Sequence, residues 1–126
     1  MVSETRVILL TPSGTGALAT VALIGPLAWE IARPLFHPVS KMSSTVTDVS
    51  LNQHWFGKCG EDIQEEVVFT LKQVEPMAWI EIHSHGGPES QRLLLDLFQS
   101  HGAIRGSATD FLDFTSTTRF RAEAGR

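Results

Sequence analysis

Residues 79–95 read WIEIHSHGGPESQRLLL and join an alternating apolar segment, two adjacent glycines and an apolar run that follows a proline. Ile80 and Ile82 alternate with polar residues, so on an extended strand the two isoleucines face the same side. The polar residues that recur at every second position are Glu81, His83 and His85. We therefore expect one face of this strand to belong to the core and the other to form a binding surface.

The two glycines and the proline that follow predict how this strand ends. Gly86 and Gly87 allow a sharp turn and a close approach of the backbone to a ligand. Pro88 suits the first position of a helix, because its missing N–H would have no partner there. We predict a ligand-binding site without an assigned catalytic residue, made of Glu81, His83, His85, Gly86 and Gly87.

The composition is that of one globular domain covering residues 1–126, of which 42% are apolar. A net charge of -4 gives no general attraction to phosphate backbones or anionic membranes. No apolar stretch approaches the roughly 20 residues needed to cross a bilayer, and the first residues do not form a secretory signal. We expect a cytoplasmic protein without a membrane partner.

Cys59 is the only cysteine, which excludes an internal disulfide and a cysteine-based metal cage. It lies within residues 57–60, which read GKCG and predict the tip of a hairpin. We expect an inert surface thiol, although Lys58 beside it could lower its pKa.

Periodicity and turn residues predict an α+β domain with a mixed β-sheet and helices on one face. The predicted elements are strands at 7–10 and 17–24, a helix from Pro26 that Pro34 ends or kinks, an irregular segment at 37–52, strands at 53–56 and 66–71 around a turn at 57–63, the strand from Trp79, a helix at 88–101 that Gly102 caps, and a short strand at 103–104. Beyond it the sequence loses periodicity.

The polar face of the Trp79 strand is compatible in principle with three kinds of site: a metal centre, a nucleophilic active site and a site for a polar, planar ligand. Its polar residues are spaced about 6.5–7 Å apart, which is too wide for three ligands of one metal ion unless the backbone bends. No nucleophile motif of the G-x-S-x-G type is present. Hydrogen bonds to a polar, planar ligand suit a carboxylate and imidazoles better.

Several segments, in order, resemble the N-terminal domain of the tRNA modification GTPase family MnmE, also called TrmE. Residues 11–19, TPSGTGALA, resemble that family's T-P-P-G-x-G-A-[IL]-A, and residues 23–26, LIGP, its L-S-G-P. Residues 80–88, IEIHSHGGP, resemble its V-E-[IV]-x-C-H-G-G-P, and residues 93–98 match the following helix. The similarity covers residues 6–105.

The resemblance implies an α+β domain related to tetrahydrofolate-binding modules, which dimerises and holds a 5-formyltetrahydrofolate-type one-carbon donor. It further implies a parent GTPase that modifies the wobble uridine of certain tRNAs with an MnmG-like flavoprotein. We expect only a full-length parent protein to bind the flavoprotein and tRNA, because these 126 residues contain no GTPase domain. The domain itself is expected to be non-catalytic.

The chain departs from the family pattern at three places. Ala22 replaces the arginine that usually precedes L-S-G-P, and residues 73–78 and 106–111 differ from the expected motifs. Loss of the arginine predicts weak or absent folate binding. The alternative from a different functional class is a stand-alone small enzyme or metal protein that uses Glu81, His83 and His85.

Overall fold

The computed structural model describes residues 4–10, 19–85 and 87–124, with side chains up to Ser116. The strands are β1 (Arg6–Leu9), β2 (Ala19–Gly25), β3 (Phe36–Pro38), β4 (His54–Gly60), β5 (Gln64–Gln73), β6 (Ala78–Ser84) and β7 (Ile104–Arg105). The helices are α1 (Ala28–Leu35), the short 3₁₀ helix η1 (Val46–Asp48), α2 (Pro88–Ser100) and α3 (Ala108–Ala124). The predicted loop at 11–16 and Gly86 lie outside the described residues.

All seven described strands form a single sheet in the order β3-β4-β5-β6-β2-β1-β7. Neighbouring strands are antiparallel except β1 and β7, which are parallel, so the sheet is mixed. The predicted α+β class is confirmed. Because β6 lies between β5 and β2, its side chains have strand neighbours on both sides.

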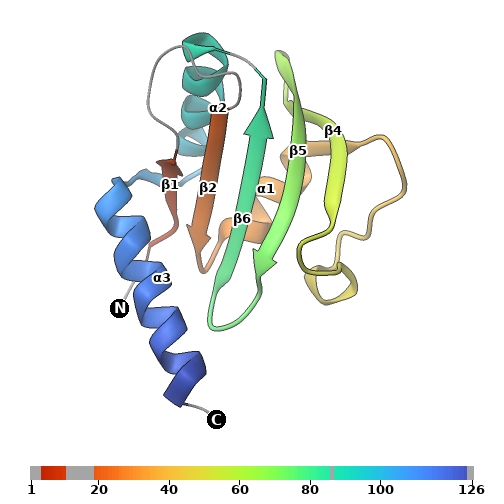
Figure 1. Cartoon of the computed structure of the whole chain (residues 1–126). Coiled ribbons are helices and arrows are strands. Elements are labelled where there is room, and N and C mark those ends of the chain that lie inside the picture. Colours follow the sequence, from red (N-terminus) through yellow and green to blue (C-terminus); the bar gives the residue numbers. More distant parts are fainter. Residues whose placement is uncertain (1–3, 11–18, 86, 125–126) are drawn as a thin grey trace.

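The main core lies between the sheet and the two helices that the sequence predicted. Ile80 and Ile82 of β6 and Phe69 of β5 are fully buried against α1 and α2. From α2, Leu94 and Phe98 enter the same cluster. As expected, both predicted helices lie on one face of the sheet, which we call the covered face (Figure 1).

The third helix, α3, was not predicted, and it packs against the other face of the sheet. Phe114 of α3 is buried beside Ile8 of β1 and Ile24 of β2. Trp79 of β6 meets the Phe114 ring edge-on at 5.9 Å between centroids. Figure 1 shows α3 in front of the β1 side of the sheet, whereas α1 lies behind the sheet. We call this second side the open face, because among the described residues α3 covers only part of it, at β1, β2 and the start of β6.

A capping box begins α3, and it is the sequence signal from which this helix could have been predicted. The Ser107 backbone N–H donates to Asp110 Oδ2 at 2.8 Å, and the Asp110 N–H donates to Ser107 Oγ at 3.2 Å. The Ser107 backbone donor holds the pKa of the Asp110 carboxyl below its usual value, with smaller contributions from the Ser107 hydroxyl and the Arg6 charge. The helix that follows is rich in threonine and phenylalanine, which have weak helix propensity, and its apolar residues do not repeat at helical spacing. Its sequence therefore did not predict a helix.

The β4–β5 hairpin differs from its prediction. β4 continues to Gly60 and β5 begins at Gln64, so the connection has only three residues and residues 57–60 are strand. Cys59 points to the covered face and is buried, so the expected surface thiol is wrong. Burial raises the pKa of Cys59 to about 12 and overrides any effect of Lys58.

The predicted helix near Pro26 is α1, with one difference at its start. The helix begins at Ala28 and not at Pro26, and Leu27 precedes it as an exposed N-cap. Pro34 lies in the last turn, and α1 ends one residue later, as expected. Among the described helices, none is both long and apolar enough to cross a membrane.

Candidate ligand-binding face

Strand β6 places Glu81 and His83 on the open face of the sheet, opposite the buried isoleucines of the same strand. Its burial alternates residue by residue from Ile80 to Ser84, as the sequence pattern predicted. On the open face, Glu81 lies opposite Ala22 of β2 and Thr70 of β5. A carboxylate is therefore held near the centre of the sheet, with only 15% of its side chain exposed.

His83 lies between Glu81 and Thr20 of the neighbouring strand. Its Nδ1 is 2.9 Å from Thr20 Oγ1, and its Nε2 is 3.6 Å from Glu81 Oε1. A carboxylate only accepts hydrogen bonds, so the neutral ring is best oriented with Nε2–H toward Glu81. In that tautomer the Thr20 hydroxyl donates to Nδ1. The 3.6 Å approach is an electrostatic contact and is too long for a hydrogen bond.

Partial burial keeps His83 in its neutral form. Loss of solvation lowers the pKa of His83 and outweighs the neighbouring Glu81 charge, which raises it. Electrostatic repulsion by His54 and Lys72 lowers the pKa of His83 further. At neutral pH, Glu81 therefore lacks a fully charged partner on the adjacent ring, which leaves it able to bind donors from a ligand.

Thr70 adds an unpaired hydroxyl next to the same carboxylate. It lies between His54 of β4 and Glu81 of β6, and it is buried although it faces the open side. Its Oγ1 has no hydrogen-bond partner in the structure. A buried hydroxyl without a partner is rare, because each one costs free energy. Thr70 and Glu81 thus place a buried donor and a partly exposed acceptor side by side.

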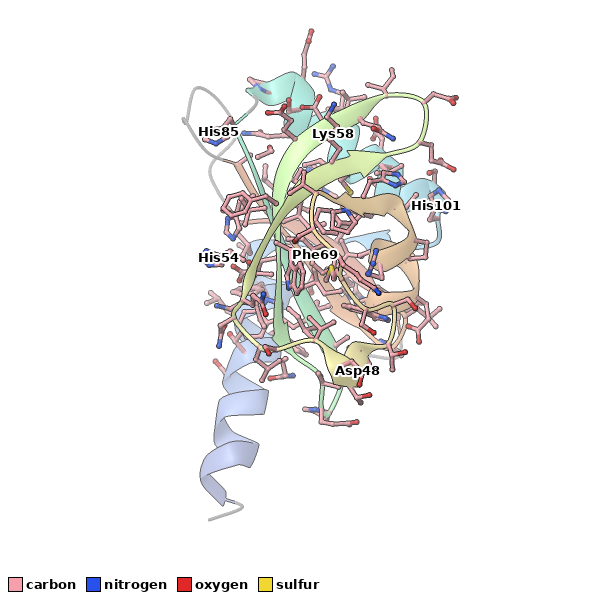
Figure 2. The ribbon with its side chains drawn as sticks, turned by 90° about the vertical axis from the view of Figure 1, so that its right-hand side faces the viewer. Asp48, His54, Lys58, Phe69, His85 and His101 are labelled. Carbon is pink, nitrogen blue, oxygen red and sulfur yellow. The ribbon has the colours of Figure 1, made fainter. Side chains whose placement is uncertain are left out.

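A hollow of about 230 Å³ lies beside this group on the open face. It is lined by Val39, Phe56, Gly57, Lys58, Glu66, Val67, Val68, His83 and His85. Figure 2, which views the molecule from the β4 side, shows His54 and His85 on the same side of the sheet. The hollow has apolar walls, and a small number of polar groups converge at its β6 end, as in many ligand sites.

The structure brings together only part of the predicted site. Glu81 and His83 are in contact, and His83 and His85 line one hollow, but Glu81 does not line that hollow. Gly87 is the N-cap of α2 with φ −77°, and a Cβ there would meet nothing within 4 Å. The backbone of the described residues therefore does not itself require glycine at position 87, since other residues adopt this φ without strain, and the close approach to a ligand stays a prediction.

Sequence reasoning missed Thr20, Thr70 and Phe56 as members of this face. Thr20 and His83 are 63 residues apart in the chain, and only the β2–β6 register makes them neighbours. The signal that could have found Thr70 was the alternation along β5, where it shares a face with Val68. No sequence pattern indicated which strand would lie beside β6.

A metal centre finds no support among the described residues. Among them, no group of three or more histidine, cysteine, aspartate or glutamate side chains has the geometry to hold a metal ion. The open face can instead accept and donate hydrogen bonds over a flat area, where the Glu81 carboxylate is partly buried.

Comparison with known proteins identifies the relatives of the chain. No family model matches it. It is 32% identical over 111 residues to the tRNA modification GTPase MnmE of Thermotoga maritima. The aligned segment covers 86% of this chain and 24% of that protein. It is 33% identical over 104 residues to MnmE of Synechococcus sp. strain RCC307, covering 79% of this chain and 22% of that protein. The chain spans about a quarter of the length of these relatives.

These similarities cover most of the chain and agree with the α+β fold. The chain is therefore a divergent relative of the MnmE family, equivalent to the N-terminal domain of those proteins.

Proposed function

We propose that the chain is a ligand-binding and dimerisation domain of an MnmE-like tRNA modification GTPase. The relatives are named for tRNA modification and GTP hydrolysis. A full-length parent of this kind would act on tRNA together with an MnmG-like flavoprotein. The observation that carries the binding role is the partly buried Glu81 carboxylate beside the unpaired Thr70 hydroxyl on the open face.

The ligand that suits this arrangement is a flat nitrogen heterocycle with adjacent donors, such as the pterin ring of a 5-formyltetrahydrofolate-type donor. A carboxylate accepts two parallel N–H donors. The buried Thr70 hydroxyl can donate to the Glu81 carboxylate beside it and so orient it. His83 is neutral, so it does not neutralise the carboxylate before the ligand arrives. The apolar part of the hollow, around Phe56 and Val68, can contact the face of a ring.

Ala22 weakens this site. It is paired directly with Glu81 across the β2–β6 register, at the position where the family usually has arginine. A charge-assisted hydrogen bond contributes about 1.5–3 kcal/mol, which is roughly one to two decades of affinity. We therefore expect the chain to bind 5-formyltetrahydrofolate weakly or not at all.

Calorimetric titration with 5-formyltetrahydrofolate tests this proposal. Ala22→Arg is expected to tighten binding by about tenfold or more, and Glu81→Gln added to that variant is expected to remove the gain. Glu30→Gln, on the exposed side of α1, is the matched control and leaves affinity unchanged. If Ala22→Arg folds normally by circular dichroism but gains no affinity, Glu81 is not part of a folate site.

The dimerisation role is tested separately. Phe56 and Val39 are exposed apolar residues of the open face, and a second copy would bury them. Sedimentation across a concentration series is expected to show a dimer that Phe56→Glu weakens. Leu112→Glu, on exposed α3, is the control. A strictly monomeric mass at high micromolar concentration contradicts this role.

A further inference from the structure

A second hollow of about 350 Å³ lies between helix α2 and the β4–β5 hairpin. It is lined by Cys59, Glu61, Asp62, Ile63, Glu65, Leu93, Leu94, Asp96, Leu97 and Ser100. In Figure 2, His101 at the end of α2 lies on the opposite side of the sheet from His54 and His85. We call this hollow the α2 groove. It is separate from the open face, and the proposed function does not use it.

The centre of the α2 groove is apolar. Cys59 and Leu94 are buried and form its floor. Ile63 at the hairpin turn is 68% exposed, and Leu93 on α2 is 37% exposed. Isolated exposed apolar residues are ordinary, but these two border one hollow with an apolar floor, which is typical of an interaction site.

The rim of the α2 groove is uniformly acidic. It carries Glu61, Asp62, Glu65 and Asp96, and the lining includes no lysine or arginine. Glu61 contacts the His101 ring at 3.1 Å, and Glu65 accepts a bond from Ser90 Oγ at 2.9 Å. Asp62 and Asp96 form no ion pair with any described residue. Two carboxylates thus remain available to a partner on opposite walls of the hollow.

The position of the α2 groove favours a helix over an extended peptide as the bound partner segment. Adding a strand requires a free sheet edge, but β4 and β5 both have neighbours within the sheet. A peptide lying in this groove must satisfy its own backbone hydrogen bonds, as a helix does. An amphipathic helix can place apolar side chains, spaced three or four residues apart, against the floor.

We propose that the α2 groove docks a basic amphipathic helix of a partner protein. Its leucine-type side chains contact Ile63, Leu93 and Leu94, and its lysines or arginines pair with Asp62 and Asp96. Charge complementarity favours a basic partner, since four carboxylates in a lining without lysine or arginine repel nucleic acid and acidic peptides.

The test uses the 126-residue chain and a fluorescein-labelled synthetic helix of leucine and lysine with one apolar face. Anisotropy measures its affinity, and amide chemical shifts locate it. The groove variant combines Asp62→Lys with Asp96→Lys. The control combines Glu30→Lys with Asp113→Lys, two exposed carboxylates outside the groove, so the change in net charge is identical. Circular dichroism verifies the fold of both.

Binding is expected to shift amides of α2 and the β4–β5 hairpin, and the groove variant is expected to bind about tenfold more weakly. The control is expected to lose no more than about twofold in affinity, because distant exposed charges are screened. Ile63→Ser is expected to weaken binding without changing its salt dependence.

Three results would overturn the proposal. Equal weakening by the control variant would mean that only net charge matters. Equal binding of a peptide with glutamate in place of lysine would remove the charge argument. Concentration-dependent shifts of the groove amides without peptide would assign the groove to a second copy of the chain.

Discussion

The two faces of the sheet are built from the same strands but differ in role: the covered face forms the main core, and the open face carries the polar groups of the proposed binding site. On β6, Ile80 and Ile82 enter the main core, whereas Glu81 and His83 alternate with them on the open face. The covered face is apolar, and two helices pack against it. The open face carries buried or half-buried polar groups without full hydrogen bonding, such as the Thr70 hydroxyl. Because successive residues point to opposite sides, stability and binding can change independently along one strand.

The largest expected contrast is between two phenylalanines on neighbouring strands. Phe69 is fully buried on the covered face and stacks on Phe36 with centroids 4.7 Å apart. Phe56 is 60% exposed on the open face. We expect Phe69→Ala to cost about 3–5 kcal/mol of unfolding free energy and Phe56→Ala about 1 kcal/mol or less. Urea unfolding measures both, and similar losses would show that the open face also supports the fold.

The next prediction concerns the part of the open face that α3 covers. Phe114 is buried between α3 and the sheet, and Trp79 packs against it. Phe114→Ala is expected to cost about 3 kcal/mol locally and to release α3. Hydrogen exchange is expected to accelerate in residues 108–116 but not in β5 or β6. Leu112→Ala, at an exposed position of α3, is the control. Unchanged protection of α3 would contradict this docking.

His83 gives the open face a pH dependence. Its pKa is lowered in the folded state, chiefly by burial, whereas an unfolded histidine titrates near pH 6.5. The unfolded chain therefore binds a proton more readily, and stability falls as pH drops below about 7 toward the lowered folded pKa. His83→Gln is expected to flatten this part of the stability profile, measured by urea unfolding at several pH values. His101→Gln, on the other side of the sheet, serves as the control.

Glu81 opposes the burial effect on His83, so removing its charge has a defined consequence. Glu81→Gln is expected to lower the pKa of His83 further, as followed by the ring proton shifts in a pH titration. A higher pKa in this variant would mean that the Glu81 charge does not act on the ring as the 3.6 Å contact indicates.

The smallest expected signal comes from the covered face. Burial raises the pKa of Cys59 to about 12, so the folded chain presents almost no thiolate at pH 8. Alkylation by iodoacetamide, followed by mass, is expected to be slow in the native protein and fast in urea. Rapid native alkylation with the fold intact would place Cys59 at an accessible site.

The features that were predicted correctly from the sequence depend on neighbours along the chain. Alternation predicted which side of β6 is buried, and the apolar spacing together with Gly102 predicted α2 and its end. The predicted hairpin tip is wrong because it treats Gly57 as a turn residue. In the structure Gly57 lies within β4, where a Cβ would collide with the His37 carbonyl of β3. The glycine permits close strand pairing there, which depends on a strand distant in sequence.

The chain's own pattern determined the α+β class, the two helices on the covered face and the polar positions of β6, because periodicity depends on neighbours along the chain. Only the tertiary structure decided which residues of other strands contact those polar side chains. The register of β2 and β5 against β6 brings Thr20 to His83 and Thr70 to Glu81. The same packing leaves an acidic groove between α2 and the β4–β5 hairpin. Contacts between strands far apart in sequence depend on the competition of all pairings at once, and no local pattern encodes that outcome.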